Sequence, residues 1–149
     1  MKLKIRVLGT LAGVFAFAAL SGVAAAADRP YTEGTVSVVN SLRTKPGMHD
    51  TYMKYLATTY RQLMEEAKKA GHVVDYNVYT TSPRGPDDPN VYLVVTYKNM
   101  AAFDGLTERM DGIQQQIVGS QQQRDAAAID RERMRTMVGS EMIRHVVFK

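Results

Sequence analysis

The chain of 149 residues carries 19 Lys and Arg against 15 Asp and Glu, a formal net charge of +4, and contains no Cys and no Trp. Without Cys, the chain can form neither disulfides nor thiolate metal sites, and Cys nucleophiles are excluded. Its length and its hydrophobic content of 45% are typical of a small globular protein.

The first 27 residues are typical of a secretory signal peptide. Three Lys and Arg residues precede an apolar run over residues 7–20, and four Ala residues stand directly before Asp28. This order predicts cleavage near Ala27 and a periplasmic or secreted mature protein, because the run is too short for a stable membrane anchor. The remaining chain has 16 Lys and Arg against 15 Asp and Glu, and this near balance argues against a nucleic-acid partner.

Residues 28–34 are predicted to form an N-terminal extension, followed by a single domain over residues 35–149. The domain opens with a strand at residues 35–42, where apolar side chains alternate with Ser and Thr. Asn40 falls on the apolar face of this strand and is predicted to bond a backbone group of a helix or loop. A Lys-Pro-Gly segment then ends the strand.

The next segment, residues 48–70, predicts a long amphipathic helix. It contains neither Gly nor Pro, and its apolar side chains recur at spacings of three and four, which places them on one helix face. The members of this stripe are Tyr52, Leu56, Thr59, Leu63 and Ala67. Gly71 follows, and a Gly in this position closes a helix.

Two strands and a loop come next. Residues 73–81 and residues 90–97 are rich in Val, Tyr and Thr, which favour strands. The intervening residues 82–89 contain three Pro and one Gly, so they predict the loop of a hairpin.

The remaining residues predict helices and a final strand. Asn99 is the predicted N-cap of the helix that follows it. Helical signals continue over residues 113–138, with a break at Gly119, and Gly139 ends them. Residues 142–148 predict the last strand. The predicted inward residues of the helical segment are Ile113, Ile117, Ile129, Met134 and Met137.

The order of elements predicts an α+β fold. Strand, helix, strand, strand, helix, strand becomes a four-stranded antiparallel sheet with its helices on one face, the ferredoxin-like arrangement, when its crossovers are right-handed. Apolar residues are expected on the second face as well, so two chains are predicted to pack sheet against sheet as a homodimer. Those residues are Val39, Val73, Tyr79 and Val94, with Ile143 or Val147.

Three segments give the chain a resemblance to a known superfamily. Residues 42–47 after the first strand, residues 70–76 at the end of the long helix and residues 97–103 after the third strand resemble the dimeric α/β-barrel superfamily. Within it, they are similar to antibiotic-biosynthesis-type monooxygenases and stress-responsive barrel domains. The resemblance covers roughly residues 33–148, and it implies a dimeric barrel without implying one function.

The haem-degrading branch of this group offers a comparison of single residues. Asn40 and Gly47 match the spacing of an Asn and a Gly in that branch. The positions of its Trp and its His fall on or near Leu106 and Gln116, and Gln cannot bind iron as imidazole does. The comparison therefore argues against haem, and no cofactor is predicted.

The favoured function is binding of a small apolar or aromatic molecule in a pocket between sheet and helices. The residues predicted to line the pocket are Asn40, Tyr52, Tyr76, Phe103 and Leu106. One alternative is a cofactor-independent monooxygenase in which Asn40 orients a phenolic or quinone-like substrate. A second alternative is a structural or envelope-stress module that acts by association alone.

The three His residues, His49, His72 and His145, are too far apart in sequence to predict a metal site. His72 is a candidate catalytic residue, because with Asp75 it could form an acid–base pair near neutral pH.

Two Gln triplets, at residues 114–116 and 121–123, predict a solvated helix face. The Arg residues that follow add a mildly basic stripe to it. They are Arg124, Arg131, Arg133 and Arg135.

Overall fold

The computed structural model describes residues 28–149, and the predicted signal peptide lies outside the described residues. Four strands form one antiparallel sheet in the order β2-β3-β1-β4. The strands are β1 (Tyr31–Thr44), β2 (Asp75–Thr80), β3 (Val91–Tyr97) and β4 (Arg135–Phe148). The predicted ferredoxin-like α+β fold is confirmed.

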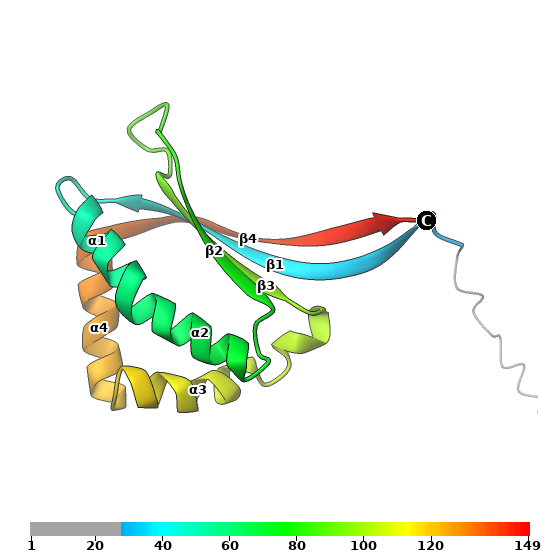
Figure 1. Cartoon of the computed structure of the whole chain (residues 1–149). Coiled ribbons are helices and arrows are strands. Elements are labelled where there is room, and N and C mark those ends of the chain that lie inside the picture. The colour runs from blue at the N-terminus through cyan, green and yellow to red at the C-terminus, as the bar shows by residue number, and fades with distance from the viewer. Residues whose placement is uncertain (1–27) are drawn as a thin grey trace, which may run out of the picture.

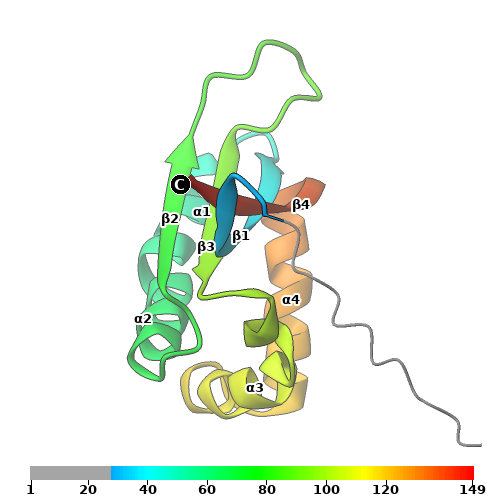
Figure 2. The same cartoon turned by 90° about the vertical axis from the view of Figure 1, so that its right-hand side faces the viewer.

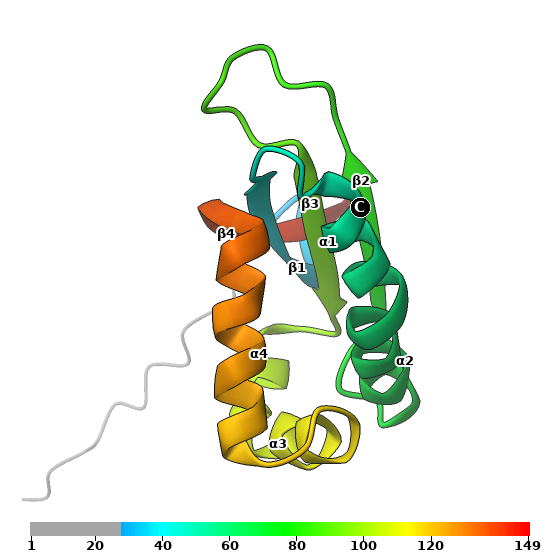
Figure 3. The same cartoon turned by 90° about the vertical axis from the view of Figure 1, so that its left-hand side faces the viewer.

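The helices lie on one side of this sheet (Figure 1). The first helical segment comprises α1 (His49–Tyr55), the π-helix η1 (Leu56–Tyr60) and α2 (Arg61–Lys69). The second comprises the 3-10 helix η2 (Met100–Phe103), α3 (Leu106–Ile117) and α4 (Gln121–Met134). In Figure 3, α4 and α2 form two columns, and α3 crosses their lower ends. Within the described chain, no helix is both long enough and apolar enough to cross a membrane.

The core lies between the sheet and the first helical segment. The predicted stripe supplies Tyr52, Leu56 and Ala67, all of which are buried. Leu42 and Val91 meet the first two from the sheet. Each of these side chains sits where the period of its own element places it, so the apolar pattern of the sequence directly builds this layer.

The strand register separates the two faces of the sheet. Asn40 lies opposite the core residue Leu93, so it faces the helices. Val39 pairs with Val94 on the other face, which the helices do not cover. Tyr79 and Ile143 lie on that open face too, as predicted, together with polar side chains, among them Ser37, Asn77 and Thr96. Val73 does not, because it is buried under α2 against Ala67 and Val95.

Strands β1 and β4 continue past the helices as a two-stranded arm that carries the C-terminus (Figure 1), and Figure 2 looks along this arm from its free end. Because β1 begins at Tyr31, part of the predicted N-terminal extension is strand that pairs with β4. The register shifts between Glu33 and Val36. Gly34 lies in this bulge, where a Cβ atom would come within 3.1 Å of His145, so the close approach of the two strands favours Gly.

Strand β4 is longer than predicted. The helix α4 ends at Met134; Met137, predicted to be helical, and Gly139, predicted to end the helix, both belong to β4. Pairing with the long β1 decides this, since backbone bonds to a neighbouring strand override the local helical signal. Ile129, predicted to point inward, is 58% exposed on α4.

Two predictions concern the ends of the helices. The break at Gly119 is confirmed: Gly119 has a left-handed backbone with φ of 108°, and Ser120 caps α4 through a reciprocal bond with Gln123. Asn99 stands at the N-cap position of η2, which begins at Met100 as predicted, but its side chain makes no cap bond. The chain first forms η2, turns at Gly105 with φ of 61°, and only then begins α3.

Candidate functional site

A small apolar pocket of about 220 Å³ lies between η1 and the edge strand β2. Its tyrosine rings, Tyr60 and Tyr76, meet edge to face with centroids 6.0 Å apart. We call this site the tyrosine pocket; its lining residues are Met53, Leu56, Ala57, Tyr60, Arg61, Tyr76 and Val78.

The π-helix η1 supplies three of the lining residues, Leu56, Ala57 and Tyr60. The N–H of Arg61 bonds the carbonyl of Leu56, an i→i−5 bond that marks the wider turn. The Thr58 hydroxyl donates to the carbonyl of Lys54 at 2.8 Å. This bond lies where the α-helical hydrogen-bond pattern of α1 gives way to the π-helical pattern of η1. Short π-helical segments inside α-helices are rare and occur frequently at functional sites.

The Tyr60 hydroxyl is the unusual polar group of the pocket. It is buried and has no hydrogen-bond partner among the described residues. Burial raises the pKa of Tyr60 above its ordinary value, so the hydroxyl stays protonated at neutral pH. A buried hydroxyl without a partner costs about 1–3 kcal/mol, and an acceptor on a bound molecule would offset that cost.

The second ring of the pocket has a partner. The Tyr76 hydroxyl donates to Glu65 Oε1 at 2.7 Å. This hydrogen bond to a carboxylate, with burial as a smaller cause, raises the pKa of Tyr76. The two tyrosines thus differ: Tyr76 is held by α2, whereas Tyr60 has a donor to offer.

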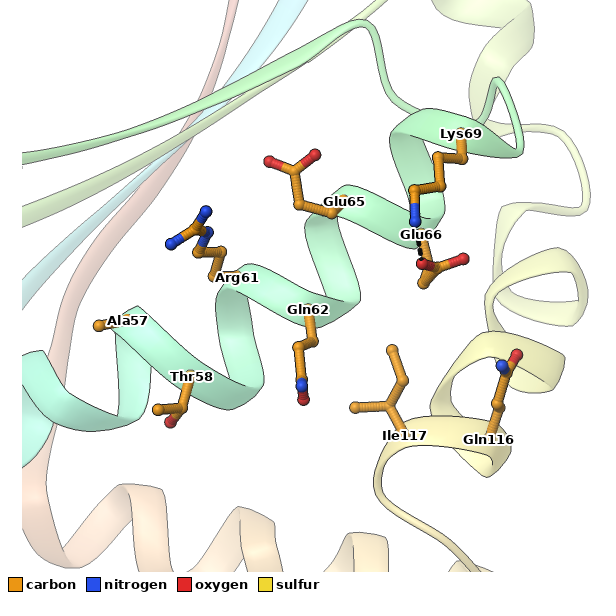
Figure 4. A pocket seen from close by; sticks show the side chains of 9 residues that line it. All are labelled: Ala57, Thr58, Arg61, Gln62, Glu65, Glu66, Lys69, Gln116 and Ile117. Carbon is orange, nitrogen blue, oxygen red and sulfur yellow. Dashed lines mark hydrogen bonds and ion pairs between the residues drawn. The ribbon is translucent and has the colours of Figure 1, made fainter.

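A polar groove adjoins the tyrosine pocket and shares Ala57 and Arg61 with it. The groove has a volume of about 670 Å³ and runs along α2 towards the end of α3 (Figure 4). Lys69 Nζ is 2.6 Å from Glu66 Oε1 on one wall, and Gln116 and Ile117 form the opposite wall. The charges of the groove are mixed, so the groove favours no single ligand charge.

The structure distributes the five predicted pocket residues over separate places. Tyr76 alone lines the tyrosine pocket. Tyr52 is 1% exposed within the core, so it offers no surface to a ligand. Phe103 packs against Tyr97 with centroids 4.5 Å apart, and Leu106 begins α3.

Asn40 is half-buried on the helix-facing side of β1. No hydrogen bond of its amide is found within residues 28–149, so the predicted bond to a backbone group is not seen there. The nearest polar neighbour across the ladder is Ser140 on β4. An amide in this position retains its capacity to bond a small molecule.

The predicted pair of His72 and Asp75 does not form. The Asp75 carboxylate is bonded by Lys68 Nζ at 2.9 Å and by the Asn77 amide at 3.2 Å. The bond from Lys68 lowers the pKa of Asp75. His72 stands in the turn after α2, where its backbone N–H bonds the carbonyl of Ala67.

Metal ligands are not grouped in the part of the chain that the structure describes, where no cluster of three or more His, Asp or Glu side chains could hold an ion. The polar and aromatic groups of the tyrosine pocket are two tyrosine rings with their hydroxyls and one guanidinium, that of Arg61.

The sequence did not predict six of the lining residues, Met53, Leu56, Ala57, Tyr60, Arg61 and Val78. Alternation along β2 is one available signal, because it places Val78 on the same face as Tyr76. No comparable signal marks η1, since the sequence of residues 48–70 reads as a regular helix.

The chain matches no protein-family model and no curated protein. Two solved structures share its fold. HapK from Hahella chejuensis is 14% identical, with 72% of this chain and 90% of HapK covered at a TM-score of 0.50. A dimeric ferredoxin-like protein from an uncultured marine organism is 11% identical, with 78% and 96% covered at a TM-score of 0.50. At such identities the likeness establishes the fold, a ferredoxin-like α+β sheet with helices on one face, and nothing about activity.

Proposed function

We propose that this protein binds a small apolar or aromatic molecule in the tyrosine pocket. The observation that carries the proposal is the Tyr60 hydroxyl, a buried donor without a partner on a residue that lines the pocket, whose other lining residues are apolar or aromatic apart from Arg61. The π-helix that places Tyr60 there supports it. An apolar cavity of about 150 Å³ is known to hold one benzene ring, so a pocket of about 220 Å³ suits a ring with one small substituent.

Two ligands that differ in one acceptor test this proposal. Acetophenone carries a carbonyl acceptor, and toluene carries none. Removing a hydrogen bond costs about 0.5–1.5 kcal/mol, so Tyr60→Phe should weaken acetophenone binding by roughly 2- to 12-fold and leave toluene binding unchanged. Isothermal titration calorimetry of the purified protein measures both affinities.

A filled pocket provides the second arm. Ala57→Trp places a large ring in the pocket and should abolish binding of both compounds. Ala126→Trp is the matched control, because Ala126 is also an exposed helical Ala and does not line the pocket. Binding that survives Ala57→Trp would contradict the proposal.

We further propose that the protein is a homodimer in which a second copy covers β4. This strand has 14 residues, is an edge of the sheet and carries exposed apolar side chains, an arrangement that promotes association unless it is covered. The marine structure of the same fold is described as dimeric. The exposed apolar residues of β4 are Met137, Val138, Met142, Ile143, Val146, Val147 and Phe148.

Light scattering at micromolar concentration tests the homodimer. Ile143→Lys should convert dimer to monomer, because it sets a charge in the proposed interface. Ile129→Lys is the control, since Ile129 is similarly exposed but lies on α4. A wild-type protein that is monomeric in this assay would refute the dimer.

We also propose that the chain is exported and that its mature form begins near Asp28. The order of basic, apolar and small residues over residues 1–27 supports this proposal. Fractionation of a Gram-negative host followed by N-terminal sequencing should find the cleaved protein in the periplasm. Uncleaved protein in the cytoplasm would be the contrary result.

A cofactor-independent monooxygenase is the second candidate function, and Asn40 is the observation in its favour. Its amide faces the helices with no side-chain partner in the described chain, so it could orient a phenolic substrate. Asn40→Ala should then reduce oxygen uptake in the presence of a hydroquinone. If neither pocket ligands nor substrates are found, association through β4 would be the remaining function.

A further inference from the structure

A second cavity, of about 140 Å³, lies among the helices and shares no residue with the tyrosine pocket. In Figure 3 the contributing elements are α4 on one side, α1 and α2 on the other, and α3 across the lower end. We call it the arginine cavity; its lining residues are Tyr55, Leu63, Gln114, Val118, Arg124 and Arg131.

The sequence predicted that the Arg residues of α4 lie on a solvated face, and this prediction is wrong for two of them. Arg124 and Arg131 are seven residues apart, about two helical turns, so both point towards the cavity. Arg135 continues the same direction into β4, and its side chain is only 12% exposed. Arg133 points outward and is 75% exposed.

Arg124 is largely buried and only partly neutralised. Its Nη1 lies 3.3 Å from Asp111 Oδ1, and its Nη2 donates to Gln121 Oε1 at 2.6 Å. Its side chain is 18% exposed, and its Nε is buried without an acceptor. That Nε is enclosed, and Nη1 also donates to the backbone carbonyl of Asp111, so Arg124 contributes positive charge to the cavity wall and its Nε is closed to a ligand.

Arg131 has no carboxylate partner. Its guanidinium lies over the ring of Tyr55, with Cζ 5.9 Å from the ring centroid. Within residues 28–149 it takes part in no ion pair and no side-chain hydrogen bond, whereas Arg133 pairs with Asp130 and Arg135 with Glu132. Arg131 is thus a half-buried positive charge that a π face alone accompanies.

Because Asp111 pairs with Arg124, the two guanidiniums leave an excess of one positive charge in a small and partly desolvated space. Like charges repel more strongly where water is excluded, and half-buried donors without acceptors lose hydrogen bonds that water would provide. An oxyanion would correct both costs at once, because a planar guanidinium bonds carboxylate and phosphate oxygens through paired N–H groups. The amide of Gln114 is a further polar group in the same wall.

We propose that the arginine cavity binds one small free oxyanion, of the size of phosphate or acetate, through the guanidinium of Arg131, with the Gln114 amide and Arg124 in the same wall. The volume of about 140 Å³ sets the size limit, since larger phosphorylated molecules exceed it. The site binds by ion pairing and is independent of ligand binding in the tyrosine pocket.

Titration calorimetry with inorganic phosphate, and separately with acetate, tests the site at constant ionic strength. The wild-type protein should show saturable binding of at least one of these ions. Arg131→Gln should weaken that binding at least tenfold. Arg133→Gln removes the same charge from the same helix and should leave binding unchanged.

Further variants keep the proposal falsifiable if Arg131→Gln does not fold. Arg131→Lys retains the charge without the paired N–H geometry and should weaken binding by a smaller factor. Gln114→Glu sets a carboxylate into the cavity and should compete with the ion. The proposal is overturned by non-saturable responses to both ions in the wild type, or by equal losses in Arg131→Gln and Arg133→Gln.

Discussion

Tyr60→Phe should have opposite effects on the stability of the free protein, which should rise, and on its affinity for a ligand with an acceptor, which should fall. The hydroxyl that the substitution removes is buried and has no partner in the described chain, so the folded protein bears its desolvation cost. That cost is about 1–3 kcal/mol, and the small void left by the oxygen offsets part of the gain. We therefore expect Tyr60→Phe to be more stable than the wild type by about 1 kcal/mol in the absence of ligand.

Thermal unfolding followed by circular dichroism measures this change. For a domain of this size, 1 kcal/mol corresponds to a rise in melting temperature of roughly 3–5 °C. Tyr76→Phe is the matched control, because the Tyr76 hydroxyl donates to Glu65 at 2.7 Å. Its loss should lower stability by about 0.5–1.5 kcal/mol. The reasoning fails if both variants are destabilised to the same extent, since the Tyr60 hydroxyl would then have a partner.

Two more predictions concern backbone conformation and alkaline pH. Gly105→Ala should lower the free energy of unfolding in urea by about 1 kcal/mol, because Gly105 has φ of 61°, which strains any residue with a Cβ atom. Gly112→Ala, within α3, should raise it by about 0.5–1 kcal/mol. A Gly105→Ala variant of unchanged stability would contradict this backbone strain. Burial raises the pKa of Tyr52, Tyr60 and Tyr97 above the ordinary tyrosine value of about 10. Their contribution to the free energy of unfolding is therefore fully present below pH 10 and is lost as the pH rises through the pKa values of the folded protein. Absorbance near 295 nm should therefore show a fraction of tyrosinate that forms only on unfolding, and complete ionisation of a still folded protein would refute this.

The first helical segment follows its sequence pattern in all but one turn. The apolar spacing of residues 48–70 correctly predicted a helix with Tyr52, Leu56 and Ala67 inside. It could not predict η1, because a single wider turn changes hydrogen bonding without changing residue type. The tyrosine pocket depends on that turn, and its lining residues were therefore missed.

The end of the chain shows the opposite relation. Local signals at residues 135–138 favoured helix, yet these residues lie in β4, which pairs with β1. The 14 residues of β1 offer backbone donors and acceptors that a neighbouring strand can satisfy. Strand pairing across a long distance in sequence outweighed local propensity, and it also produced the exposed apolar edge on which the proposed dimer rests.

The sequence alone determined the order of the strands and helices, the sheet topology and the main core residues. It could do so because apolar periodicity and turn residues act locally, and few topologies accommodate that order of elements. Only the tertiary structure decided that Asp75 pairs with Lys68 instead of His72 and that the Tyr60 hydroxyl is left without a partner. The physical reason is that hydrogen bonds and charge pairs depend on distances of a few ångströms between elements, which residue spacing along one chain does not specify.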